Sequence, residues 1–190
     1  MIKFTVQHIK DFKKSKIVFP SITAYDYTSA QIVDESQIPL ILVGDSASMM
    51  VYGYDTTIPI SMSEMLLIVR AVTRGAKHSL VVADMPFLSY QPSIEETIRN
   101  AGLFLKDGGA AAVKLEGGVH VENHIRSLVN SGIPVLGHVG LTPQSYHQLS
   151  GYKIQGKTPE GAQKIIDDAM AVQSAGAVSY THLRAHETLL

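Results

Sequence analysis

Short apolar runs alternate with longer amphipathic stretches along the chain, and this alternation restricts the fold more than any other feature. The apolar runs, rich in β-branched residues, lie at 17–24, 40–44, 80–83, 111–115 and 134–139. Continuous apolar runs suit parallel strands that are covered on both faces. Predicted helices occupy the stretches near 27–37, 63–76, 93–107, 119–131 and 160–175. This order predicts an α/β fold with a parallel sheet.

Two architectures fit this pattern: an open doubly wound sheet and a closed (β/α)₈ TIM barrel. No G-x-G-x-x-G motif follows the first predicted strand, which weakens the dinucleotide-binding version of the open sheet. Polar residues follow several strands, as in barrel active sites, although open sheets also carry sites there. A barrel of about 250 residues has roughly 31 residues per βα unit. We therefore expect an incomplete TIM barrel, with about five βα units and the start of a sixth.

Composition excludes several function classes. The net charge is -1 and basic residues are scattered, which argues against nucleic acid as a partner. The 190 residues include no cysteine, so neither disulfides nor thiolate metal sites are available. The N-terminal segment lacks the apolar core of a signal peptide, and every apolar run is too short to span a bilayer. We expect a soluble cytoplasmic protein without a membrane partner.

Acidic residues stand at the carboxyl ends of three successive predicted strands. Asp45 follows the second strand, Asp84 the third, and Glu116 the fourth. Each aspartate alone also fits a turn or a helix cap. Together the three would converge at one edge of the sheet, where unpaired carboxylates raise each other's pKa. A hard divalent cation such as Mg²⁺ relieves this repulsion, so the pattern predicts a metal site.

Three other polar residues accompany these acids. Strand periodicity puts Lys114 on the same face as Glu116, where it could stabilise an oxyanion or a substrate carboxylate. A structural ion pair is the alternative, although burying two charges for that purpose alone is seldom favourable. His138 lies near the end of the fifth strand and also fits a core histidine. Ser46 follows Asp45 and also fits a helix cap.

A histidine pair offers a second possible metal site. His120 and His124 are four residues apart, with Glu122 between them. This order is not H-E-x-x-H, and no third ligand is evident. We expect both histidines on the exposed face of a helix.

The segments around these residues resemble the ketopantoate hydroxymethyltransferase family. In chain order they are SITAYDYTSA, LVGDSASMMVYGYDTTIPISMSEM, VVADMPFLSY, VKLEGG, GHVGLTPQS and GYKIQGKTPEGA. The resemblance covers roughly residues 5–177. It implies a (β/α)₈ barrel in a homodecamer, with an N-terminal helix across the bottom of the barrel. It also implies hydroxymethyl transfer from 5,10-methylenetetrahydrofolate to 3-methyl-2-oxobutanoate, which gives 2-dehydropantoate in pantothenate biosynthesis.

The resemblance further implies roles for individual residues. Asp45, Asp84 and Glu116 match its magnesium ligands. Four residues match its keto-acid contacts: Asp45, Ser46, Asp84 and Lys114. Lys114 and His138 are the catalytic candidates. The implied mechanism removes the C3 proton of the keto acid, and Lys114 helps to hold the charge of a magnesium-chelated enolate. The enolate then attacks the one-carbon unit of the folate.

The chain departs from the family pattern after residue 177. The family's base is a glutamate at the end of the sixth strand, and Leu183 occupies that position here. Glu187 lies four residues later, so the role is not transferred to it. We interpret 1–177 as one partial barrel domain and 178–190, which lacks the expected hydrophobic strand run, as a non-native tail. This chain alone is therefore expected to be inactive, with open sheet edges that favour aggregation.

Two alternative functions remain. A magnesium-dependent lyase or mutase of the phosphoenolpyruvate mutase/isocitrate lyase group also acts on 2-oxo acids on a similar barrel. A non-catalytic keto-acid-binding remnant would retain the acidic site without the base.

Overall fold

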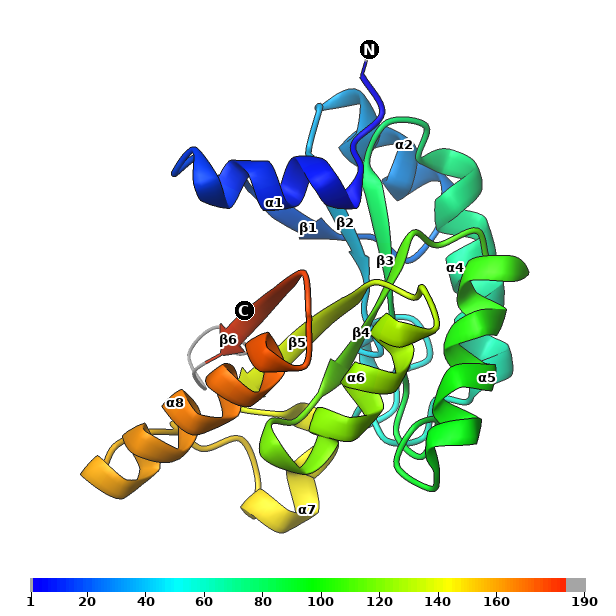
Figure 1. The fold of residues 1–190 in the computed structure, drawn as a ribbon. Helices are drawn as coiled ribbons and strands as arrows, with labels where there is room; N and C mark the ends of the chain where they lie inside the picture. Colours follow the sequence, from blue (N-terminus) through cyan, green and yellow to red (C-terminus); the bar gives the residue numbers. More distant parts are fainter. Residues whose placement is uncertain (1, 184–190) are drawn as a thin grey trace.

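Six parallel strands form one curved sheet in the computed structural model, which describes residues 2–183 (Figure 1). The strands are β1 (Ser21–Thr23), β2 (Leu40–Val43), β3 (Leu80–Asp84), β4 (Ala112–Glu116), β5 (Val135–Gly140) and β6 (Ser179–Leu183). Each strand pairs in parallel with the strand before it in the sequence. A doubly wound sheet would reverse this order at a switch point. The sequential order confirms the barrel-type fold.

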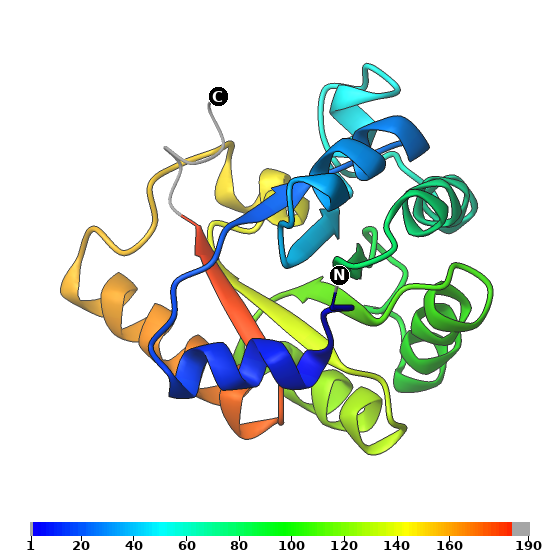
Figure 2. The ribbon, with the colours of Figure 1, turned by 90° about the horizontal axis from the view of Figure 1, so that it is seen from above.

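The longer helices after the first one cover the outer face of the sheet, and Figure 2 shows them as a partial ring outside the strands. The α-helices are α1 (Val6–Lys14), α2 (Tyr27–Glu35), α3 (Ala47–Met50), α4 (Met62–Gly75), α5 (Ile94–Lys106), α6 (Glu122–Asn130), α7 (Tyr146–Leu149) and α8 (Pro159–Ser174). Two 3₁₀ turns also occur: η1 (Val119–Val121) and η2 (Pro143–Ser145). Among residues 2–183, no helix is both long and apolar enough to cross a membrane.

The two faces of the sheet differ in composition because successive side chains of a strand alternate between them. Val81, Val113 and Val135 point outward and pack against the helices in the main apolar core. The inner face is apolar at the amino ends of the strands, where Leu80 and Ala112 belong to a second cluster. The same face becomes polar toward the carboxyl ends, so a polar site can form at one end of the barrel only.

Helix α1 covers the apolar end of this inner face. Ile9 is the buried residue of the helix, and it packs with Leu40, Leu80 and Ala112. Thr5 caps the helix by accepting a hydrogen bond from the backbone N–H of His8. This placement agrees with the helix across the barrel bottom that the family resemblance implied.

The first strand is shorter than the predicted run 17–24. Only Ser21–Thr23 pair with β2, and Val18 is 96% exposed. Pro20 has no backbone N–H to donate to a strand partner, which explains why pairing begins after it.

The described chain continues as a strand beyond residue 177. Residues Ser179–Leu183 form β6, which pairs in parallel with Leu136–Gly140 of β5, although the sequence there lacks a hydrophobic run. Backbone pairing to the open edge of β5 therefore extends the sheet beyond residue 177. The remainder of the proposed tail, 184–190, lies outside the described residues.

Candidate active site

The six candidate residues come together at the carboxyl ends of the strands. They line one cavity of ≈ 570 Å³: Asp45, Ser46, Asp84, Lys114, Glu116 and His138. All except Ser46 are only 1–4% exposed. Residues that are up to about a hundred positions apart in sequence thus share one buried polar environment. The predicted convergence of the three acids is therefore a feature of the fold.

Strand register determines which of these side chains touch. Asp84 pairs with Lys114 across β3 and β4, and Glu116 pairs with His138 across β4 and β5. Accordingly, the Lys114 Nζ lies 2.6 Å from the Asp84 Oδ2 and 4.0 Å from the Glu116 Oε1. The His138 Nδ1 lies 3.1 Å from the same Glu116 oxygen. Lys114 therefore bridges two carboxylates, and His138 contacts one of them.

Lys114 is a buried cation. Burial alone would lower the pKa of its ammonium group, but the carboxylates of Asp84, Glu116 and Asp45 together hold this pKa above its ordinary value. The side chain is therefore charged at neutral pH. A fixed positive charge at this position can stabilise negative charge on a bound ligand.

The two aspartates resist ionisation. Burial raises the pKa of Asp45 well above its ordinary value, and the charges of Asp84 and Glu116 raise it further. Burial also raises the pKa of Asp84, although Lys114 beside it acts in the opposite direction. Three carboxyl groups thus share one lysine, which leaves an excess of negative charge when all of them ionise.

Glu116 behaves differently from the aspartates. Burial would raise its pKa, but His138, Lys114 and the backbone N–H of Gln144 lower it below its ordinary value. Its Oε2 accepts a hydrogen bond from that N–H at 3.0 Å. Glu116 is therefore the carboxylate of the set that the fold itself keeps ionised.

Ser46 does not act as a helix cap. Its side chain makes no capping hydrogen bond to α3, which begins at the next residue. Its hydroxyl instead lies 2.8 Å from the hydroxyl of Tyr25, and both side chains line the cavity. The contact leaves Ser46 at the cavity wall beside Asp45, where it can face a ligand.

The carboxylate oxygens of the cavity are suitable ligands for a hard divalent cation, although they are not yet arranged around one position. The Asp84 Oδ1 is buried and has no hydrogen-bond partner among residues 2–183, and Asp45 lies beside it at the end of β2. Within that range, however, no three His, Asp or Glu side chains are already arranged around a common metal position. Glu116 presents a similar oxygen. Its Oε2 accepts a hydrogen bond from the backbone N–H of Gln144, whereas its Oε1, 3.1 Å from the His138 Nδ1, also has no hydrogen-bond partner among residues 2–183.

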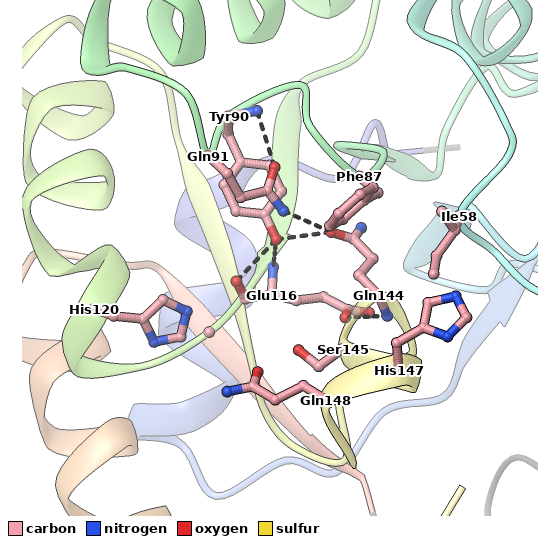
Figure 3. Close-up of a pocket in the computed structure, with 11 residues that line it drawn as sticks. Ile58, Phe87, Tyr90, Gln91, Glu116, His120, Gln144, Ser145, His147 and Gln148 are labelled. Carbon is pink, nitrogen blue, oxygen red and sulfur yellow. Dashed lines mark hydrogen bonds between the residues drawn. The ribbon is translucent and has the colours of Figure 1, made fainter. Parts of the chain in front are cut away.

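Gln144 is the main site residue that sequence reasoning missed. It is 5% exposed, and its side-chain Nε2 donates to the Asp45 Oδ2 at 2.9 Å. Figure 3 shows Gln144, Tyr90 and Glu116 meeting at the wall of a second cavity of ≈ 360 Å³, which Glu116 also lines. The position of Gln144 in the segment GHVGLTPQS, directly after the fifth strand, is the signal that could have identified it.

The two histidines were predicted to lie on the exposed face of a helix, but only one of them is exposed. His120 lies at the rim of the smaller cavity (Figure 3). His124 is half-buried, and its Nδ1 lies 2.9 Å from the hydroxyl of Thr97 on α5. The expectation of an exposed His124 was wrong because α5 packs against α6 at this position.

Strand β6 ends at Leu183, where the family resemblance places the catalytic base. Glu187 lies outside the described residues. Residues 2–183 therefore hold the acids, the lysine and the histidine of the site.

Fold and cavity together define a class of protein: β/α-barrel enzymes with an acidic site at the carboxyl ends of the strands. Phosphonopyruvate hydrolase has a similar structure, with a TM-score of 0.71 and 15% identity over 95% of this chain and 63% of that one. A second structure of that enzyme contains oxalate and Mg²⁺ (TM-score 0.70, 14% identity, the same coverage). A 2,3-dimethylmalate lyase of the phosphoenolpyruvate mutase/isocitrate lyase superfamily has a TM-score of 0.68 and 12% identity, over 96% of this chain and 63% of that one. At these identities the likeness is one of fold.

Sequence comparison identifies the family. A profile of ketopantoate hydroxymethyltransferase matches residues 3–182. Two relatives named 3-methyl-2-oxobutanoate hydroxymethyltransferase are 54% identical (Carboxydothermus hydrogenoformans) and 51% identical (Dehalococcoides mccartyi). Each alignment covers 93% of this chain, and 64% and 63% of the respective relatives. The chain belongs to the ketopantoate hydroxymethyltransferase family, and it spans less than two thirds of the length of these relatives.

Proposed function

We propose that the complete protein transfers a hydroxymethyl group from 5,10-methylenetetrahydrofolate to 3-methyl-2-oxobutanoate and forms 2-dehydropantoate. The observation that carries the proposal is the cavity that joins the buried side chains of Asp45, Asp84 and Glu116 to Lys114, in a chain of this family. A 2-oxo acid carries a carboxylate and a polarisable keto oxygen. Both groups suit a cavity that combines a fixed cation with carboxylates able to hold a metal.

We propose that Asp45 and Asp84 hold Mg²⁺, with Glu116 as the third carboxylate of the set. Two observations support this assignment: the Asp84 Oδ1 has no hydrogen-bond partner among residues 2–183, and three carboxyl groups crowd around one lysine. Bound Mg²⁺ would supply Lewis-acid polarisation of the keto group, which makes the C3 hydrogen more acidic. In this proposal the two aspartates and Ser46 also contact the keto acid.

The chain's own residues would assist the reaction in two ways. Lys114 would hold its ammonium group close to the negative charge that develops when the C3 proton leaves. Both ring nitrogens of His138 are buried and lack an aligned hydrogen-bond partner within residues 2–183, so this ring can contact a reacting substrate. The attacking carbon would then form a bond to the folate methylene carbon, and both bonds of that carbon to nitrogen would break. Water would supply the hydroxyl group, and the C3 proton and the second proton of that water would end on the two folate nitrogens.

The experiment that tests this proposal measures binding and turnover separately. Isothermal titration of the 190-residue chain with 3-methyl-2-oxobutanoate should show binding that requires Mg²⁺. Asp84→Asn should weaken it at least about tenfold, since metal ligation and the Lys114 contact both depend on this carboxylate. Asp107→Asn, an exposed aspartate at the end of α5, is the matched control and should change nothing.

Turnover then separates the candidate functions. The complete protein should form 2-dehydropantoate only with folate and Mg²⁺. Binding of the keto acid without turnover would favour the non-catalytic keto-acid-binding protein. Folate-independent cleavage of 2,3-dimethylmalate would favour the lyase group. Full magnesium-dependent turnover by Asp84→Ala would overturn the proposed site.

We further propose a homodecamer in the cytoplasm for the complete protein, on the basis of the family resemblance. Sedimentation velocity of the complete protein tests the assembly. A dimer or a monomer as the largest species would contradict it.

A further inference from the structure

The side-chain amide of Gln144 uses all of its hydrogen-bonding capacity. Its Nε2 donates to the Asp45 Oδ2 at 2.9 Å and to the Met85 carbonyl oxygen at 2.8 Å. Its Oε1 lies 2.8 Å from the Tyr90 hydroxyl and 3.3 Å from the Gln91 Nε2 (Figure 3). An amide has two donor hydrogens and two acceptor lone pairs, so no capacity remains.

These partners determine which way the amide points. Met85 offers a carbonyl oxygen, which can only accept, so the NH₂ group must lie on the side of Met85 and Asp45. Tyr90 shares its single hydroxyl hydrogen between the Gln144 Oε1 and the Glu116 carbonyl oxygen, at 2.8 and 2.9 Å. A flipped amide would put its oxygen against the Met85 oxygen and its NH₂ group against two donors. The donor that faces Asp45 is therefore locked in place.

The same residue also fixes a second carboxylate. Its backbone N–H donates to the Glu116 Oε2 at 3.0 Å. The hydroxyl of Tyr90 in turn accepts from the backbone N–H of Glu116 at 3.2 Å. One residue from the loop after β5 thus holds the carboxylates that end β2 and β4, and Tyr90 braces it from the loop after β3.

We propose that Gln144, oriented by Tyr90, is the positioning residue that sets the geometry of the carboxylates of Asp45 and Glu116 for cation binding. Gln144 does not line the larger cavity and acts only through these two acids. The inference rests on the proposed metal site. Groups that orient metal-binding carboxylates typically change metal affinity by about 10- to 100-fold when they are removed.

The first test compares Mn²⁺ affinities by electron paramagnetic resonance, with Mn²⁺ as the probe in place of Mg²⁺. Gln144→Met keeps a similar side-chain volume but removes the donor, and it should weaken Mn²⁺ binding by about 10- to 100-fold. Gln148→Met is the matched control, because Gln148 lines the same smaller cavity in an exposed position and contacts neither acid. Equal affinities for the two variants would overturn the proposal.

A double-mutant cycle tests whether Tyr90 acts through Gln144. Tyr90→Phe should weaken Mn²⁺ binding less than Gln144→Met does, and it should have no further effect once Gln144 is already Met. A purely structural role predicts the reverse, namely parallel losses in melting temperature with unchanged Mn²⁺ affinity. Additive effects on affinity would show that Tyr90 acts independently.

A metal-free measurement separates this inference from the proposed function. In a crystal structure of Gln144→Met, the Asp45 carboxylate should leave the position that it occupies beside Gln144. If wild-type protein binds no Mn²⁺, the proposed metal site fails, and the Asp45 position still decides whether Gln144 orients it. An unchanged Asp45 carboxylate in the variant would refute the positioning role.

Discussion

Asp45 is a carboxyl group that is both buried and surrounded by other carboxyl groups. Its raised pKa means that the folded protein binds a proton more tightly at this position than the unfolded chain does. Protonation therefore stabilises the fold, whereas ionisation prepares the site for a cation. Stability and ligand binding oppose each other at this residue.

The pH dependence of stability should reveal this conflict. Because the folded pKa is raised, the stabilising contribution of Asp45 is full below the unfolded pKa of about 3.9 and is lost as pH rises through the folded pKa. Asp45→Asn should therefore gain stability relative to wild type as pH rises, in chelator-treated protein. Urea titrations from acid to neutral pH measure the difference. Added Mg²⁺ should stabilise only wild type, and more strongly at higher pH. A difference that does not vary with pH would contradict the assignment.

Asp34 shows the opposite behaviour at the other end of the barrel. Its carboxylate accepts hydrogen bonds from the backbone N–H groups of Lys77, His78 and Ser79 at 3.0, 2.9 and 2.7 Å. Burial would raise its pKa, but these donors and the His78 ring hold it well below the ordinary value. The ionised carboxylate thus joins the end of α2 to the start of β3.

Asp34→Asn should destabilise the fold by about 2–3 kcal/mol at neutral pH, because it replaces a charged acceptor of several N–H groups. Since the folded pKa is lowered, the wild-type advantage is present above pH of about 3.9 and disappears as pH falls toward the folded pKa. Chemical denaturation at neutral and acidic pH measures the difference in unfolding free energy between wild type and the variant. Glu35→Gln, at an exposed neighbouring position, is the control. A similarly small effect for both variants would contradict the argument.

At the residue scale, sequence reasoning found the acids, the lysine and the histidine because each stands at or near the end of an apolar strand. It missed Gln144, whose one signal was its place in the segment GHVGLTPQS, and Tyr90, because position along the chain after a strand says little about direction in space. Nor could it pair Asp84 with Lys114 or Glu116 with His138, since those contacts depend on strand register. Register arises from packing of the whole sheet.

At the scale of elements, the long amphipathic helices and the buried strands β2 to β5 were predicted to within one or two residues at most ends. Apart from β1, which was predicted too long, the failures were elements without a hydrophobic pattern. The short helices α3 and α7 contain four residues each, too few to show a period. Strand β6 has no apolar run, and its backbone pairing to β5 has no sequence signature.

The contact between α8 and the loop after β4 offers a test at this scale. Asp168 on α8 accepts a hydrogen bond from the backbone N–H of Val119 at 3.0 Å and pairs with Lys164. A Cβ atom added at Gly118 would overlap the Asp168 side chain. This glycine therefore permits the close approach of helix and loop beside Glu116.

Gly118→Ala should destabilise the protein by about 1–3 kcal/mol, because the helix or the loop must move. Gly102→Ala provides a matched comparison inside α5, where an added Cβ meets nothing within 4 Å. That variant should instead gain about 0.5–1 kcal/mol from its higher helix propensity. Thermal melts and urea titrations of both variants check the two signs. Equal effects would show that the Asp168 contact is not the cause.

For the whole molecule, the sheet has two open edges within the described chain. Strand β1 pairs only with β2, and β6 only with β5. Ile22 on β1 is 43% exposed, although its register partner Ile41 is fully buried. Unpaired strand edges beside exposed apolar side chains favour association with other chains.

The 190-residue chain should therefore self-associate at micromolar concentration. Ile22→Lys places a charge on the edge strand and should shift sedimentation-velocity profiles toward the monomer. Leu67→Lys changes an exposed apolar residue on α4, away from both edges, and serves as the control. If both variants, or neither, alter association, the β1 edge is not the contact surface.

We also propose that 178–190 is a non-native tail and that the native domain continues differently after residue 177. The family profile matches through residue 182, so a strand at this place agrees with the family. The proposal concerns which amino acids the native protein has there. The sequence of the source locus beyond codon 177 tests it. A glutamate at the end of a sixth strand would support the proposal, and the codons for VSYTHLRAHETLL at that locus would refute it.

The strict pairing of each strand with its predecessor has a consequence for how the protein is made. A ribosome delivers the strands in the same order in which they join the sheet, so each strand from β2 to β6 emerges when its partner edge already exists. Among residues 2–183, only β1 has to wait for its first partner, and that partner is the next strand to be translated. Translation and sheet growth can therefore proceed in the same direction, one βα unit at a time.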